Sequence, residues 1–187
     1  MNVTSLGNAL DTVLWQMIMF KPPDAAVVTA VAGGGVSAVV DLWTRRVPNP
    51  LTLGLAALGV AFAASQPSAV SFSSALAGFA LGFLLMLPGR LVGATGAGDV
   101  KLFAAIGTLL GPRGIAIAFF YTAIAGGLLA VAVAIRRGSL RDTVDRTAAF
   151  VRTGGANAPE IEHASVDNRF AYAPAIALGT LVAALGF

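Results

Sequence analysis

The sequence predicts an all-α membrane protein of about six transmembrane helices, folded as a single domain over residues 1–187. Two observations carry this prediction. First, 57% of the 187 residues are hydrophobic and only 11% are charged, with a mean hydropathy of +0.82. Second, the apolar residues are gathered into runs that approach the length of about 20 residues that a helix needs to cross a bilayer. Both features are typical of integral membrane proteins.

Six apolar segments account for most of the chain. They cover residues 25–42, 50–64, 69–87, 100–110, 115–135 and 171–187. The fourth is short for a full span, so we expect it to be completed by its neighbours or to lie partly inside the bundle. An earlier apolar stretch, residues 10–20, is also short and is expected to lie in the membrane interface.

Local signals mark several of these boundaries. The Asn49–Pro50 pair fits an N-cap followed by the first residue of the second segment. The Pro88–Gly89 pair is expected to end the third segment, and Gly111–Pro112 the fourth. Glycines spaced four residues apart predict close packing between helices. These pairs are Gly78 with Gly82 and Gly107 with Gly111.

Six spans divide the cationic residues unequally between the two sides of the membrane. One side receives Arg45, Arg46, Arg90, Lys101, Arg136, Arg137, Arg141, Arg146, Arg152 and Arg169, and the other only Lys21 and Arg113. Cytoplasmic loops carry an excess of Lys and Arg, so the first side is predicted to be cytoplasmic and both termini to lie outside the cytoplasm. Residues 136–170 then form a cytoplasmic loop, in which residues 139–152 fit an amphipathic surface helix.

The composition also excludes several kinds of site. The chain has no cysteine and a single histidine, His163, so we expect no metal site, no thiol nucleophile and no cofactor. The cationic residues flank apolar runs and form no basic face. Membrane lipid, rather than nucleic acid, is therefore the expected partner.

Two acidic residues stand out from this pattern. Asp41 closes the first apolar segment, and Asp99 opens the fourth within Gly96-Ala97-Gly98-Asp99. Acidic groups set against hydrocarbon are costly and indicate function. The six predicted spans place both at cytoplasmic helix ends, which makes the chain a candidate intramembrane aspartyl enzyme.

Two carboxyl groups in one site can hydrolyse a peptide bond. One, ionised, takes a proton from water, while the other, protonated, polarises the carbonyl group and protonates the departing amine. Gly96 and Gly98 leave the backbone beside Asp99 open to an extended substrate. Pro48 and Asn49 are further candidates on the approach, because Pro48 turns the chain after Asp41.

Four cationic residues lie close to these aspartates in the sequence. They are Arg45, Arg46, Arg90 and Lys101. We expect them to contact acidic lipid head groups or an acidic part of a substrate.

Simpler roles are open for the aspartates. Asp99 fits a helix cap, and Asp41 fits an interfacial residue paired with Arg45, four positions on. Paired membrane carboxylates also bind cations or relay protons in transporters. The predicted location near the helix ends, and the lack of an inverted repeat, argue against a transporter.

Two sequence motifs resemble those of the type IV prepilin peptidases, which are polytopic GxGD aspartyl proteases. The first is Asp41 with the downstream Arg46-Val47-Pro48-Asn49, and the second is Gly96-Ala97-Gly98-Asp99-Val100-Lys101-Leu102. The closing segment from Tyr172 to Gly179 is similar to the last helix of that family. Val47 stands where isoleucine is more usual, and Ala171 where proline is.

The resemblance implies an aspartic-type endopeptidase that removes the short basic leader of type IV pilin-like precursors. Cleavage would take place at the cytoplasmic face of the bacterial inner membrane, with Asp41 and Asp99 as the catalytic pair. Larger family members carry a cysteine-containing insertion and methylate the new amino terminus. This chain has no cysteines and no room for that insertion, so methyltransferase activity is not expected. The short form is similar to the Flp/Tad pilus peptidases, and an archaeal preflagellin peptidase is the nearest alternative.

Overall fold

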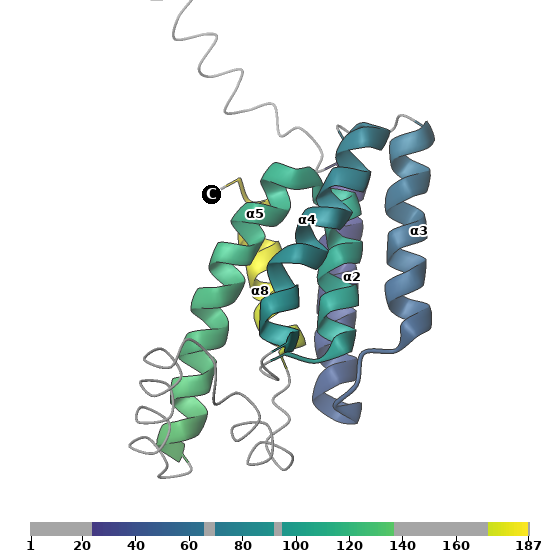
Figure 1. Cartoon of the computed structure of the whole chain (residues 1–187). Coiled ribbons are helices and arrows are strands. Elements are labelled where there is room, and N and C mark those ends of the chain that lie inside the picture. The colour runs from purple at the N-terminus through teal and green to yellow at the C-terminus, as the bar shows by residue number, and fades with distance from the viewer. Residues whose placement is uncertain (1–23, 66–69, 92–94, 137–171, 187) are drawn as a thin grey trace, which may run out of the picture.

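The computed structural model describes residues 24–65, 70–91, 95–136 and 172–186. In these ranges the chain forms helices and no strand, which confirms the prediction of an all-α protein (Figure 1). The helices are α2 (Ala25–Thr44), α3 (Asn49–Ser65), α4 (Phe72–Leu91), α5 (Ala97–Arg136) and α8 (Ala173–Ala184). The predicted interfacial stretch at residues 10–20 and nearly all of the polar loop at residues 136–170 lie outside the described residues.

Helix α5 is two helical arms joined at Gly111. This residue has φ 69° and ψ −179°, a backbone conformation outside the helical region that glycine adopts readily. Pro112 follows and has no backbone N–H with which to continue the hydrogen-bond ladder. The first arm rises through the bundle and the second runs back down and outward (Figure 1). The two arms correspond to the predicted segments 100–110 and 115–135, so all six predicted segments contain a helix.

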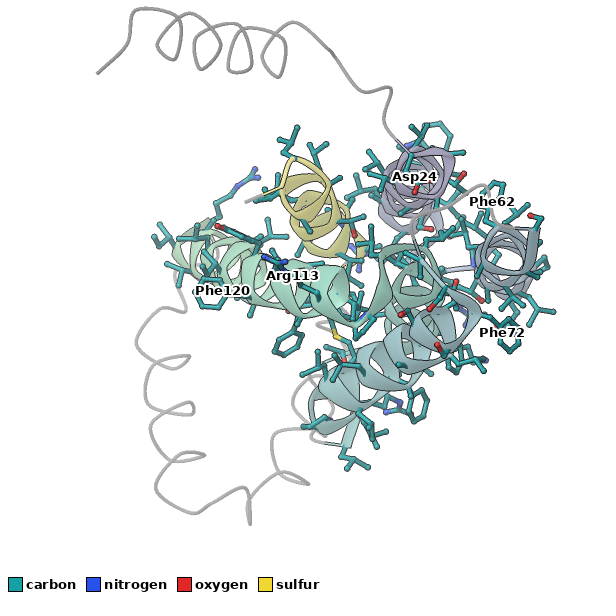
Figure 2. All side chains as sticks on the ribbon, turned by 90° about the horizontal axis from the view of Figure 1, so that it is seen from above. Asp24, Phe62, Phe72, Arg113 and Phe120 are labelled. Carbon is teal, nitrogen blue, oxygen red and sulfur yellow. The ribbon has the colours of Figure 1, made fainter. Side chains whose placement is uncertain are left out.

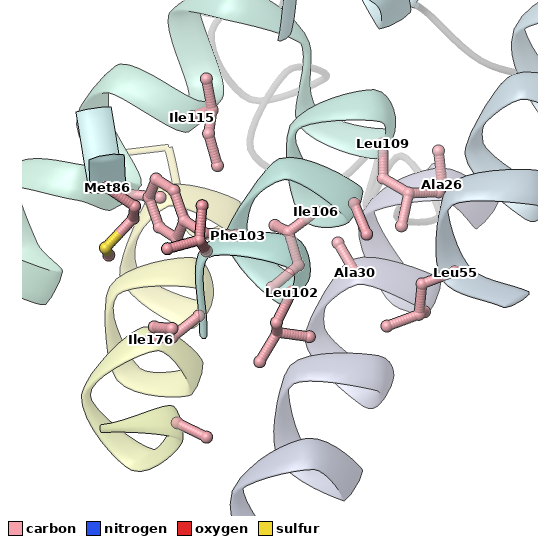
Figure 3. Close-up of a cluster of buried hydrophobic side chains, with 14 residues drawn as sticks. Ala26, Ala30, Leu55, Met86, Leu102, Phe103, Ile106, Leu109, Ile115 and Ile176 are labelled. Atoms are coloured by element: carbon pink, nitrogen blue, oxygen red, sulfur yellow. The ribbon is translucent and has the colours of Figure 1, made fainter. Parts of the chain in front are cut away.

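The first arm of α5 is the centre of the bundle. Leu102, Phe103, Ile106 and Leu109 have no exposed surface, and α5 contacts each of the other four described helices. Figure 3 shows these side chains meeting Met86 of α4, Leu55 of α3 and Ile176 of α8. A helix that is apolar on all sides belongs in an interior. The short fourth segment therefore lies inside the bundle, as expected for it.

Large apolar side chains cover much of the outside of the bundle. Leu53 is 74% exposed, Leu128 68% and Phe120 63%, and Phe120 points outward in Figure 2. Apolar surface of this extent on helices indicates contact with lipid. Three helices (α2, α4 and α5) are long and apolar enough to cross a membrane, whereas α3 and α8 are shorter apolar helices.

Two predicted helix boundaries are wrong. Helix α4 does not end at Pro88 but continues to Leu91, because a proline in the last turn removes only one hydrogen bond. The carbonyl group of Gly89 then accepts a hydrogen bond from the N–H of Thr95, at 3.1 Å.

Helix α3 likewise starts one residue early. The carbonyl group of Pro48 accepts the N–H groups of Leu51 and Thr52, so Asn49 is the first helical residue and not the N-cap.

Glycines allow α4 and the first arm of α5 to meet backbone to backbone. A methyl group added at Gly78 would lie 2.9 Å from the carbonyl carbons of both Gly107 and Gly111. One added at Gly82 would lie 2.9 Å from the carbonyl oxygen of Phe103. Close approach of this kind is what the four-residue glycine spacing predicted.

Each of the five described helices has one end at the same end of the bundle, and the candidate site lies there. The C-termini of α2 and α4 lie there with the N-termini of α3, α5 and α8, at the lower end in Figure 1. Of the cationic residues that the structure describes, Arg113 lies at the upper end, where Figure 2 labels it. The other five belong to helix ends or turns at the lower end: Arg45, Arg46, Arg90, Lys101 and Arg136.

Candidate functional site

Asp41 lies in the last full turn of α2 and is only 5% exposed. Its Oδ2 atom accepts a hydrogen bond from the backbone N–H of Ala173, at 3.3 Å. Ala173 is the first residue of α8, so this bond joins positions that are 132 residues apart in the chain. An N–H at a helix start has no partner within its own helix and suits a negative charge. The start of α8 therefore holds the carboxyl group of Asp41.

Asp99 lies in the first turn of α5 and is 6% exposed. Its Oδ2 atom accepts a hydrogen bond from the N–H of Gly96, three residues earlier, at 3.0 Å. This is the contact by which an acidic residue in the third helical position reaches back to the N-cap residue. The simpler reading of Asp99 as the N-cap is therefore wrong in position: Asp99 is the third residue of α5, and its side chain reaches back to Gly96. This contact does not compete with a second role, because a carboxylate has about four acceptor positions.

The two carboxyl groups lie at the same end of the bundle although their residues are on different helices, Asp41 near the C-terminus of α2 and Asp99 near the N-terminus of α5. They are close enough for the negative charges of Asp41 and Asp99 to repel each other. Asp41 forms no ion pair with Arg45 among the described residues; instead, the N–H of Arg45 donates to the backbone carbonyl of Asp41, at 2.7 Å. The alternative of an Asp41–Arg45 pair is therefore wrong.

This arrangement favours proton transfer. Two buried carboxyl groups that repel each other can hold one proton between them. The described residues give each carboxyl group one backbone N–H, which leaves further acceptor positions for water or a substrate. Sharing one proton between two acids supplies a base and an acid in the same place.

The two glycines before Asp99 have different surroundings. A methyl group added at Gly96 would lie 3.0 Å from Oδ2 of Asp99, so a side chain there would press on the carboxyl group. One added at Gly98 would lie 3.1 Å from Cβ of Val47 and 3.4 Å from its carbonyl oxygen. Gly98 therefore faces the turn between α2 and α3, which gives it a packing role beside the predicted role in substrate approach.

The remaining predicted residues divide into two groups. Pro48 and Asn49 lie in and after the α2–α3 turn, where Oδ1 of Asn49 accepts a hydrogen bond from Nζ of Lys101, at 3.0 Å. The other group consists of arginines whose side chains are exposed at the same end of the bundle. They are Arg45, Arg46 and Arg90.

Sequence reasoning did not place Tyr172 at the site. Tyr172 is half-buried and directly precedes Ala173, whose N–H donates to Asp41. It also lies close enough to Asp99 for an electrostatic interaction with that carboxyl group. Its ring rests against Gly126 in the second arm of α5, where an added methyl group would lie 2.6 Å from Cε2 and 2.7 Å from the phenol oxygen. The motif that begins at Tyr172 was the available signal, but nothing in its spacing indicates contact with residues so far away in the sequence.

Comparison with known proteins gives a family. Residues 26–131 match the model of the type IV leader peptidase family. The matched range is more than half of the chain and includes both Asp41 and Asp99. The chain belongs to the type IV leader peptidase family.

A curated relative supports this assignment. The chain is 32% identical over 102 residues to the prepilin leader peptidase/N-methyltransferase of Bacillus subtilis (strain 168). The match covers 54% of this chain and 41% of that relative, so the chain corresponds to about two fifths of its length. No solved structure matches the chain.

Proposed function

We propose that the protein is a membrane-embedded aspartic-type endopeptidase that removes the short basic leader of Flp-type prepilins and related precursors at the cytoplasmic face of the bacterial inner membrane. The observation that carries this proposal is that Asp41 and Asp99, from two different helices, are both buried at one end of an apolar bundle and near enough to interact electrostatically. Membership in the leader peptidase family supports the class of substrate. We expect no N-methyltransferase activity of these residues, which include no cysteine.

The proposed reaction needs only the two acids and a water molecule. The ionised carboxylate takes a proton from water while the water oxygen attacks the scissile carbonyl carbon. The protonated acid donates a hydrogen bond to the carbonyl oxygen. The tetrahedral intermediate collapses when the protonated acid gives its proton to the departing amine, and the peptide C–N bond breaks; the proton taken from water stays on the other carboxyl group, so the pair again holds one proton. The N–H groups of Gly96 and Ala173 hold the two carboxyl groups in place for these transfers.

Co-expression with a Flp-type prepilin tests the proposal. We expect the precursor to shift to its mature size, and mass spectrometry to find a new, unmethylated amino terminus at the leader junction. A precursor with its basic leader replaced by an uncharged one of equal length serves as the control. Cleavage of no prepilin by the purified protein, together with ion flux into vesicles that depends on both aspartates, would establish the transporter alternative instead.

The proposed orientation makes a separate prediction about topology. Reporter fusions after Arg46 and within residues 140–165 should read cytoplasmic, and a fusion at residue 187 should read external. The charge asymmetry supports this, because five of the described cationic residues lie toward the aspartate end of the bundle and one lies at the other. A cytoplasmic reading at residue 187 would mean that the number of spans is wrong.

A matched pair of neighbouring glycines tests the part played by Tyr172. Gly126→Ala should push the ring of Tyr172 away and lower prepilin cleavage by about 10- to 100-fold, as displacements of about 1 Å do in active sites. Gly127→Ala makes the same chemical change one residue later, where nothing lies within 4 Å, and should cleave at the wild-type rate. Equal rates for the two variants would show that the position of Tyr172 does not matter.

A further inference from the structure

The turn between α2 and α3 is docked onto the first two turns of α5 by two contacts. Nζ of Lys101 donates a hydrogen bond to Oδ1 of Asn49 across 52 residues of sequence, at 3.0 Å. Beside it, Val47 packs where a side chain at Gly98 would otherwise stand, with its Cβ 3.1 Å from that position. One contact is polar and the other apolar, and both join the same two segments.

These contacts lie close to both aspartates in the sequence. On α5 they are made on either side of Asp99, and the α2–α3 turn that makes them comes shortly after Asp41. Gly98 and Lys101 are three residues apart on α5, so they lie on neighbouring positions of one helix face, and Asp99 lies between them in the sequence. The docked turn begins directly after the last turn of α2, which carries Asp41. It starts with Arg45 in the left-handed conformation, at φ 51°, which a residue with a side chain adopts at a cost. Arg45 is the C-cap of α2, and its N–H donates to the carbonyl group of Asp41, so the helix ends and the turn begins at a defined point.

Both partners in the polar contact are exposed, so neither is needed to fill the core. A lysine ammonium is a compact charge on a flexible stem that could extend into solvent. Here it is instead directed at the amide oxygen of Asn49. This use differs from the lipid or substrate contact that the sequence suggested for Lys101, and it accounts for Asn49 at the start of α3.

We propose that Lys101 is a positioning residue: by holding Asn49, it docks the α2–α3 turn on α5 and sets the separation of the Asp41 and Asp99 carboxyl groups. The inference rests on the proposed peptidase function for its catalytic consequence. The docking itself does not depend on that function, and it can be measured separately.

A double-mutant cycle on prepilin cleavage tests the catalytic consequence. Lys101→Met and Asn49→Ala should each lower kcat by about 5- to 30-fold with little change in KM, and the double variant should be no worse than either single one. Lys101→Arg and Asn49→Asp keep a cationic donor and an acceptor, and should retain most of the activity. Arg136→Met removes a positive charge from the same end of the bundle and should cleave like wild type. An effect on KM alone, or additive losses in the double variant, would overturn the proposal in favour of a lipid or substrate contact.

A cross-linking assay measures the docking without activity. The chain contains no cysteine, so Val47→Cys with Gly98→Cys introduces the only two thiols. Their Cβ atoms would start 3.1 Å apart, so the two segments need to separate by only a few tenths of an ångström to reach the range of about 3.5 to 4.5 Å that a disulfide requires. Adding Lys101→Met to this pair should slow oxidative cross-linking by about fivefold or more, and adding Arg136→Met should not. Cross-linking that is indifferent to Lys101, in a protein whose wild type cleaves prepilin, overturns the docking and leaves the proposed function intact. Cross-linking that depends on Lys101, in a protein that cleaves no prepilin, overturns the proposed function alone.

Discussion

Asp41→Asn and Asp99→Asn are each expected to abolish prepilin cleavage, by about 10³-fold or more, while leaving the fold unchanged. An amide cannot take a proton from water or return one to a leaving amine, and general acid–base steps of this kind contribute factors of about 10² to 10⁴ each. The fold should survive because asparagine keeps an oxygen that can accept the N–H of Ala173 at position 41 and that of Gly96 at position 99. Rates with a purified prepilin, together with thermal unfolding in detergent, check both expectations.

Asp24→Asn is the matched control for this experiment. Asp24 caps the other end of α2, where its Oδ1 accepts the N–H of Ala26 at 3.0 Å, and asparagine is an equally good cap. The same chemical change at the far end of the same helix should therefore leave cleavage unchanged. If either Asp41→Asn or Asp99→Asn keeps full activity, the carboxyl groups have only a structural role and the aspartyl mechanism is wrong.

The helices could be predicted from sequence because their signals are local. Apolar runs, the Gly111–Pro112 break and glycine spacing each act within a few residues, and all six segments appear in the structure. Proline gave the clearest error, since Pro88 was expected to end α4 and does not. The energy lost at a proline depends on how many hydrogen bonds remain to be made after it, which a pattern of residues does not reveal.

The site could be predicted only in part. The two aspartates were found because charge next to hydrocarbon is unusual in any sequence. The hydrogen bonds around the aspartates were not predicted, because they join residues far apart in the chain. They run from the N–H of Ala173 to Asp41 and from the ammonium group of Lys101 to Asn49. Such contacts depend on how helices are arranged in three dimensions, and no periodicity encodes them. The Asp41–Arg45 pairing failed for a related reason, because Arg45 leaves the helix at that position.

The largest effect on stability is expected at Gly78. A leucine there would drive its side chain into the backbone of Gly107 and Gly111, which cannot give way as a flexible side chain would. Overpacking of this kind costs about 3 kcal/mol or more, and in a chain of this size it should lower the unfolding temperature by about 6 °C or more. Thermal unfolding of the purified protein in detergent measures this shift.

Gly54→Leu is the control, because it makes the same change on α3, where nothing lies within 4 Å, and it should leave the unfolding temperature close to that of wild type. Gly107→Leu should reproduce the loss from the opposite side of the contact, since a methyl group added there would lie 2.6 Å from the carbonyl carbon of Gly78. Cleavage should fall together with stability in both damaging variants, because the arm of α5 that packs against α4 also carries Asp99. Equal unfolding temperatures for Gly78→Leu and Gly54→Leu would mean that α4 and α5 do not meet at this contact.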